Sequence, residues 1–140
     1  MFVDVPDDTD EEELIYMADE ALTRLYEYSF KHEHLALLTT RKRHDLHKST
    51  VEQSRKNYVR TIWDKSQAFY GTVSGFKGLE RSCVVLAVNG FHENVDPTST
   101  LYTGVTRARD VLVIVAKRSS LNGILDEQAI DSFQKMEVEI

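Results

Sequence analysis

The chain has 140 residues, 41% of them hydrophobic and 29% charged, with six Gly and two Pro. This length suits one domain spanning residues 1–140, and the composition excludes a disordered or fibrous chain. The net charge of −6 argues against a general nucleic-acid binder. There is one cysteine, Cys83, and no apolar run approaches the ~20 residues that cross a bilayer, so we expect a cytoplasmic protein without membrane contact.

The first third of the chain predicts a helix, a strand and a basic segment. Asp8 or Thr9 can cap a helix running to about Tyr28, because Thr9 and Glu12 have the spacing of a capping box. Residues 35–40 form a continuous apolar run, which indicates a strand covered on both faces. Residues 41–60 then carry seven Lys or Arg against two acids, whereas residues 1–20 carry nine acids and no Lys or Arg. Contact with DNA phosphates at this basic segment is one interpretation and a charged surface helix is the commoner one.

The remainder alternates strands and helices. Strands are predicted at residues 68–73, 83–88 and 111–116. Asp96 and Pro97 open a helix running to about Arg109, and a closing helix is expected over residues 121–136. This alternation predicts an α/β layered domain with a mostly parallel sheet, in which the carboxyl ends of the strands are the first place to look for function.

The loop after the second predicted strand holds glycines, a lysine and a hydroxyl, so a phosphate-binding loop has to be considered. Residues 71–80 read Gly-Thr-Val-Ser-Gly-Phe-Lys-Gly-Leu-Glu. A P-loop needs Gly-Lys-Ser/Thr opening a helix, and neither this loop nor any other stretch supplies it. On its residues alone the loop fits a tight turn between strands equally well, and the chain by itself is not expected to hold a nucleoside triphosphate tightly.

Two ordered motifs nevertheless resemble those of superfamily-one helicases of the UvrD/Rep/PcrA kind. Residues 72–80 resemble motif five, Thr-x-His-x-x-Lys-Gly-Leu-Glu, and residues 101–110 resemble motif six, whose core is Tyr-Val-Ala/Gly-x-Thr-Arg-Ala. The run at 35–40 is similar to the strand that follows motif four. The resemblance implies a RecA-like fold (P-loop NTPase type) and the C-terminal motor domain of an ATP-dependent DNA helicase or translocase.

The resemblance also implies roles for individual residues. Arg107 matches the motif-six arginine that contacts the γ-phosphate and stabilises transition-state charge. Gly78 and Glu80 match positions at the nucleotide, where the glutamate accepts a hydrogen bond from the ribose. Thr72 and Ser74 match positions near single-stranded DNA, although the family usually has His in place of Ser74. Lys77 could contact DNA or stabilise the turn by pairing with an acid, and both interpretations stay open.

The resemblance also implies cofactors and partners. ATP and Mg²⁺ are expected to bind mainly to a first RecA-like domain, which is absent from these 140 residues. The expected partners are that first domain and single-stranded or partly duplex DNA. Only 31 residues separate Thr40 from Thr72, so the accessory subdomain of UvrD and Rep has no room and a compact form is implied.

Several residues have interpretations simpler than a functional role. Arg109 is interpreted as a cation at the end of a helix. His32, His34, His44 and His47 lack the partners of a four-ligand metal set, so no metal site is predicted. Trp63 could stack on bases or pack in the core, and both interpretations stay open.

The rival function is a non-catalytic α/β interaction module that retains the strands. Placement of Glu80 and Arg107 at opposite sheet edges would favour that rival.

Overall fold

The computed structural model describes residues 1–28, 30–42, 68–76 and 79–138. Its centre is a sheet of five parallel strands in the order β1-β5-β4-β2-β3. The strands are β1 Phe2–Val5, β2 Leu35–Thr39, β3 Phe69–Thr72, β4 Arg81–Ala87 and β5 Ala108–Lys117. The parallel α/β sheet expected from the sequence is therefore confirmed.

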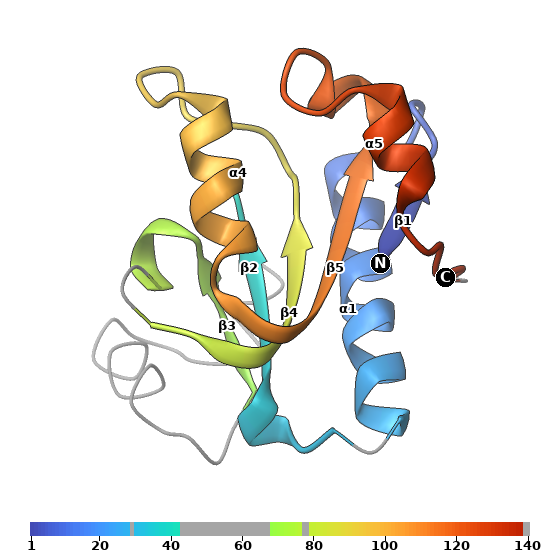
Figure 1. Ribbon diagram of the computed structural model, residues 1–140, viewed down its shortest axis with the longest axis vertical. Coiled ribbons are helices and arrows are strands. Elements are labelled where there is room, and N and C mark those ends of the chain that lie inside the picture. The colour runs from blue at the N-terminus through green and yellow to red at the C-terminus, as the bar shows by residue number, and fades with distance from the viewer. Residues whose placement is uncertain (29, 43–67, 77–78, 139–140) are drawn as a thin grey trace.

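Helices cover both faces of the sheet (Figure 1). Helix α1 (Glu11–Glu27) packs on one face, whereas α4 (Pro97–Val105) and the short α5 (Glu127–Ser132) pack on the other. Alternate side chains of β4 serve the two layers, because successive residues of a strand point to opposite faces. Three 3₁₀ turns complete the described elements: η1 His32–His34, η2 Ser74–Phe76 and η3 Arg118–Leu121.

The helix starts are set by carboxylate caps. Asp10, rather than Asp8 or Thr9, caps α1: its carboxylate accepts a hydrogen bond from the Glu13 amide at 2.8 Å. The predicted cap was therefore wrong by one or two residues, since any of three neighbouring polar residues can serve and only the backbone register selects among them. Asp96 caps α4 as expected, and its carboxylate accepts from the Thr98 amide at 3.2 Å.

The C-terminal part differs from the continuous helix predicted over residues 121–136. The chain breaks after η3, where Gly123 adopts a left-handed φ of +80°, and α5 starts only when Asp126 accepts from the Ala129 amide at 2.7 Å. Beyond α5 the chain runs along β1. The Phe2 amide donates to the Gln134 carbonyl at 2.8 Å, and Phe2 accepts from the Met136 amide at 2.9 Å. The helical prediction failed there because pairing with β1 satisfies the same backbone groups.

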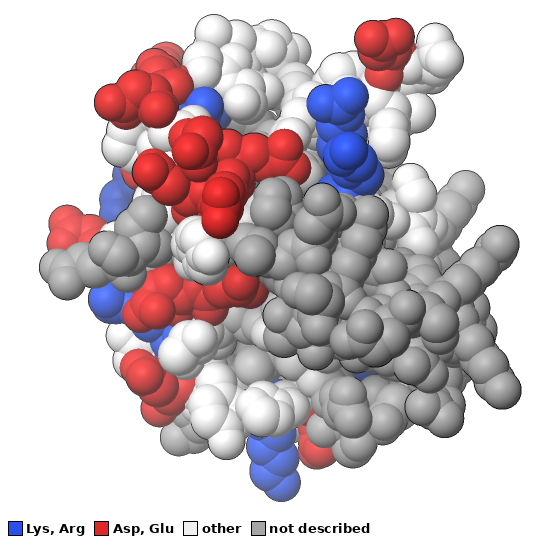
Figure 2. All heavy atoms as spheres, turned by 180° about the vertical axis from the view of Figure 1, so that it is seen from behind, with Lys and Arg blue, Asp and Glu red and all other residues white. Residues whose placement is uncertain are grey.

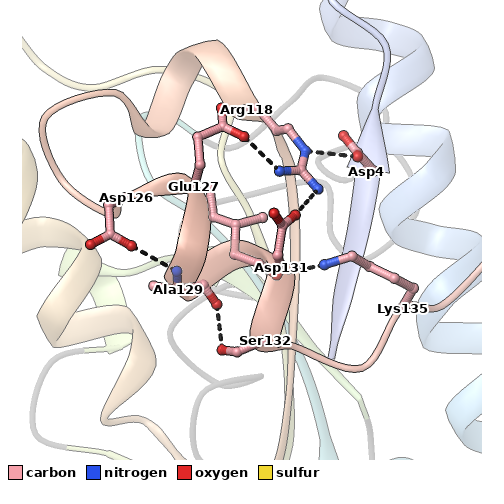
Figure 3. Close-up of polar contacts among 9 residues, drawn as sticks. Asp4, Arg118, Asp126, Glu127, Ala129, Asp131, Ser132 and Lys135 are labelled. Atoms are coloured by element: carbon pink, nitrogen blue, oxygen red, sulfur yellow. Dashed lines mark hydrogen bonds and ion pairs between the residues drawn. The ribbon is translucent and has the colours of Figure 1, made fainter.

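Arg118 fastens α5 to the sheet (Figure 3). Its guanidinium lies 2.9 Å from a carboxylate oxygen of Asp4 in β1, 3.1 Å from Glu127 and 3.0 Å from Asp131 in α5. One planar fork thus joins the carboxyl ends of β1 and β5 to the helix packed beside them.

Candidate nucleotide-facing edge and strand-facing edge

Glu80 and Arg107 lie next to each other at the amino-terminal edge of the sheet, where β4 and β5 begin. The Arg81 amide donates to the Arg107 carbonyl at 3.0 Å, and Arg81 is paired with Ala108 in the ladder. Glu80 directly precedes β4 and Arg107 directly precedes β5. The two residues therefore share one edge, the arrangement that the sequence required of a helicase motor domain.

The guanidinium of Arg107 is held by the end of α4 and by the loop before β4. Its Nε–H donates to the Thr103 carbonyl at 3.0 Å, Nη2–H to Thr106 Oγ1 at 3.2 Å, and Nη1–H to the Leu79 carbonyl at 3.3 Å. A guanidinium has five N–H donors, so one on Nη1 and one on Nη2 have no partner among the described residues. Arg107 is half-buried, which leaves these two donors within reach of solvent or a docked domain.

A close approach between α4 and the sheet sets the position of Arg107. A Cβ atom on Gly104 would lie 2.8 and 3.0 Å from the two δ carbons of Leu86 and 3.2 Å from Val73 Cγ2. Leu86 is completely buried, so its side chain would have to shift within the core to admit that Cβ atom. Glycine therefore lets the last turn of α4 rest on the sheet three residues before Arg107.

Arg109 was misinterpreted as a helix-end cation, because α4 ends at Val105 and Arg109 lies in β5. Its Nη2–H donates to Ser82 Oγ at 3.0 Å, and its Nε lies 3.9 Å from Glu80 Oε1. The error came from extending the helix across Thr106, where the chain turns directly into the strand. Arg109 thus belongs to the same edge as Glu80.

Thr72 and Ser74 lie at the opposite, carboxyl-terminal edge. Thr72 ends β3, and its hydroxyl oxygen accepts a hydrogen bond from the Gly75 amide at 2.9 Å, which closes the turn η2. Ser74 is exposed. The structure does not bring these hydroxyls together with Glu80 and Arg107. Lys77 and Gly78 lie outside the described residues.

The carboxyl edge also holds residues that the sequence did not single out. Asn89 accepts from the Arg41 amide at 3.1 Å and donates to the Lys42 carbonyl at 3.0 Å, so it fastens the chain leaving β2. The hydroxyl of Thr40 donates to the Gly90 carbonyl beside it. These residues follow β2 and β4, where the strand order reverses, and the rule that ligands bind at such a switch point could have pointed to them.

Arg81 was also missed. It is 6% exposed and donates from Nη1 to the Glu33 carbonyl at 2.9 Å, with the His32 and Leu35 carbonyls at 3.4 and 3.3 Å. It thereby ties the start of β2 to the start of β4. A charged residue opening an apolar strand was the only signal in the sequence.

Charge is distributed unevenly over the described surface. Figure 2 shows acidic side chains gathered on the face covered by α1. The exposed acids there include Asp7, Asp8, Asp10, Glu11, Glu12, Glu13 and Glu27. Exposed Arg41 and Lys42 instead lie at the carboxyl edge, next to β2. The acids that begin α1 adjoin the same edge, since Asn89 Nδ2–H donates to Glu11 Oε1 at 3.4 Å, so positive and negative side chains lie side by side there. The rest of the basic segment, His44, His47 and Trp63 lie outside the described residues.

The part of the chain that the structure describes contains no group of three or more His, Cys, Asp or Glu residues placed to hold a metal ion. The same residues form no helix long and apolar enough to cross a membrane. Cys83 is a free, fully buried thiol, and desolvation, reinforced by the Asp110 carboxylate, raises its pKa to about 11.

Comparison with known proteins bears on the segment that holds both motifs. No curated protein matches the chain. Residues 67–115 match the family model described as UvrD-like helicase C-terminal domain. The matched segment runs from the residues before β3 to near the end of β5, and β2 lies outside it. Over residues 67–115, therefore, the chain carries the signature of a UvrD-like helicase C-terminal domain, on a parallel α/β sheet of the RecA-like kind.

Proposed function

We propose that this chain is the C-terminal motor domain of an ATP-dependent helicase or translocase acting on single-stranded or partly duplex DNA. The observation that carries the proposal is the shared position of Glu80 and Arg107 at the amino edge of β4 and β5, fixed by the hydrogen bond between the Arg81 amide and the Arg107 carbonyl. ATP and Mg²⁺ would be held mainly by a first RecA-like domain docked against this edge.

Arg107 would supply positive charge to the γ-phosphate. Hydrogen bonds from three of its nitrogens hold the guanidinium in place, and the remaining N–H groups on Nη1 and Nη2 form a fork suited to two phosphate oxygens. A cation already fixed before the cleft closes needs no reorganisation when charge develops on the transferring phosphoryl group. Hydrolysis would thereby depend on closure of the two domains.

Glu80 would accept a hydrogen bond from the ribose. Its side chain is 58% exposed, so the carboxylate can face a nucleotide bound on the docked domain. A carboxylate accepts about four hydrogen bonds, and the Arg109 guanidinium at 3.9 Å occupies only one side of it. Together the two residues fit opposite ends of one nucleotide, with Gly78 proposed beside them.

The carboxyl edge would face the DNA strand. Exposed Ser74, the half-buried hydroxyl of Thr72 and exposed Arg41 are suited to phosphate oxygens, and Lys77 is proposed to add to them. Glu11, at the acidic start of α1, reaches Asn89 at this edge, and repulsion by these acids would keep a phosphate backbone toward β3, where Thr72 and Ser74 lie. Such contacts read no base sequence, as a translocating motor requires.

The rival function is a non-catalytic interaction module, and one observation favours it. Arg107 donates to the Thr103 carbonyl in the last turn of α4 and to the Leu79 carbonyl, and a residue that only caps α4 and holds the loop before β4 would make the same contacts. In that case its removal would cost stability and leave any ATP hydrolysis by the full-length protein unchanged.

The test is ATP hydrolysis by the full-length protein, with and without single-stranded DNA, for wild type and Arg107→Ala. We expect the variant to lose about 10³-fold or more in turnover. Arg24→Ala is the control, because Arg24 is a partly exposed arginine that pairs with Glu20 at 3.8 Å in α1, on the sheet face opposite α4. Undiminished turnover in a folded Arg107→Ala protein would overturn the proposal and leave the interaction module.

A further inference from the structure

We propose that Arg109 is a positioning residue that holds the Glu80 carboxylate toward the nucleotide ribose, so that it governs the affinity for ATP and not the rate of hydrolysis. This inference rests on the proposed function and adds to it a residue outside the roles that the motifs assign. It starts from an irregularity of the sheet beside the proposed nucleotide.

The ladder between β4 and β5 slips by one residue at the amino edge. Arg81 pairs with Ala108 and Cys83 pairs with Val111, so two steps along β4 are matched by three along β5. The extra residue falls at Arg109 and Asp110. A bulge of this kind breaks the regular alternation of a strand and re-aims a side chain that would otherwise follow it.

The contacts of Arg109 show the result. Its Nη2–H donates to Ser82 Oγ at 3.0 Å on the neighbouring strand, and its Nε lies 3.9 Å from Glu80 Oε1. Ser82 holds one nitrogen of the guanidinium, and another nitrogen of the same group lies near the carboxylate. The planar guanidinium can engage both partners in a fixed geometry.

A partner of this kind would orient the Glu80 carboxylate before a nucleotide binds. Both side chains are more than half exposed, at 58% for Glu80 and 54% for Arg109. An unpaired exposed glutamate samples several rotamers, and binding a ribose hydroxyl would have to select one of them. The pairing with Arg109 restricts the carboxylate beforehand and leaves its remaining lone pairs for the nucleotide.

Arg107 and Arg109 thus contact different parts of the candidate site. The described contacts of Arg107 are with Thr103, Thr106 and Leu79, whereas Arg109 contacts Ser82 and Glu80. Loss of Arg107 should lower kcat, and loss of Arg109 should raise KM for ATP with kcat unchanged, because an interaction made equally in the ground state and the transition state affects only binding.

The experiment compares full-length wild type, Arg109→Ala and Ser82→Ala, with Arg24→Ala as a matched control. The control removes another surface Arg–Glu pair of nearly the same separation, 3.8 Å against 3.9 Å. KM and kcat are measured with ATP and with 2′,3′-dideoxy-ATP, which lacks both ribose hydroxyls. For Arg109→Ala we expect a rise in KM for ATP of about three- to fivefold, no rise for the dideoxy nucleotide, and unchanged kcat. Ser82→Ala should show a smaller rise with the same nucleotide dependence.

A double variant separates positioning from direct contact. Glu80→Ala combined with Arg109→Ala should have the KM of Glu80→Ala alone, because a residue acting through Glu80 has no effect once Glu80 is gone. Additive effects, or an equal rise with the dideoxy nucleotide, would overturn the inference. If Arg107→Ala abolishes hydrolysis while Arg109→Ala behaves as wild type, only this inference fails. If Arg107→Ala hydrolyses ATP normally, the proposed function itself fails.

Discussion

Replacing Gly104 by alanine should destabilise this chain, although the same change on an exposed helix is usually favourable. Alanine in place of glycine adds about 0.8 to 1.0 kcal/mol of helix propensity. Against this gain stands a Cβ atom only 2.8 Å from Leu86 Cδ1 and 3.2 Å from Val73 Cγ2, in a layer where Leu86 has no exposed surface. Overpacking of this kind costs about 1 to 3 kcal/mol, so we expect a net loss of roughly 1 kcal/mol in the free energy of unfolding.

The assay is urea denaturation of this chain followed by far-ultraviolet circular dichroism. Thr98→Ala is the control, because Thr98 lies in the same helix but is exposed, and this variant should be neutral or slightly stabilised. Displacement of α4 would also shift Arg107, three residues further on, so turnover by the full-length Gly104→Ala protein should fall. A rise of about 1 kcal/mol in the free energy of unfolding of Gly104→Ala, as expected on an exposed helix surface, would refute the close approach of α4 to the sheet.

Two further predictions concern the network at α5 and the buried thiol. Arg118→Gln leaves the carboxylates of Asp4, Glu127 and Asp131 facing one another without their cation, so the melting temperature should drop. Added salt screens these ion pairs, so it should reduce the difference in melting temperature between variant and wild type. Equal melting temperatures at low salt would show that the network contributes nothing to stability. Burial raises the pKa of the Cys83 thiol to about 11, so stability should decline as the pH rises toward 11, and more in wild type than in Cys83→Ala. Alkylation by iodoacetamide at pH 8 should be slow until the chain unfolds, and rapid alkylation of the folded chain would contradict the burial.

The sequence predicted those strands and helices whose signals are local. Four strands were predicted, three of them (β2, β4 and β5) from continuous apolar runs, and α4 was predicted because Asp96 and Pro97 mark its start. Strand β1 was missed, since four residues that include Asp4 carry no periodic signal and form a strand only by pairing with β5. The closing helix was overextended for the same reason: partners distant in sequence determine the backbone there.

For the candidate site, the roles of the residues stay predictions, whereas the shared sheet edge of Glu80 and Arg107 was expected and is found. The motifs identified Glu80 and Arg107, and the structure places them at one edge. The rule that function lies at the carboxyl ends of strands directed attention to the loop after Val73, yet these two residues lie at the amino ends, because each immediately precedes a strand. The pairing of Arg109 with Glu80 could not be foreseen, since it depends on a bulge that exists only once β4 and β5 have paired.

The central claim is that Arg107 acts on the phosphate during hydrolysis, and Arg107→Lys in the full-length protein tests it most directly. Lysine keeps the positive charge but loses both the fork and the planar fit between Thr103 and Leu79. We predict that kcat for ATP, measured with saturating single-stranded DNA, falls by about 10³-fold while KM changes by less than about threefold. A kcat equal to that of wild type, in a protein with the wild-type melting temperature, would contradict it.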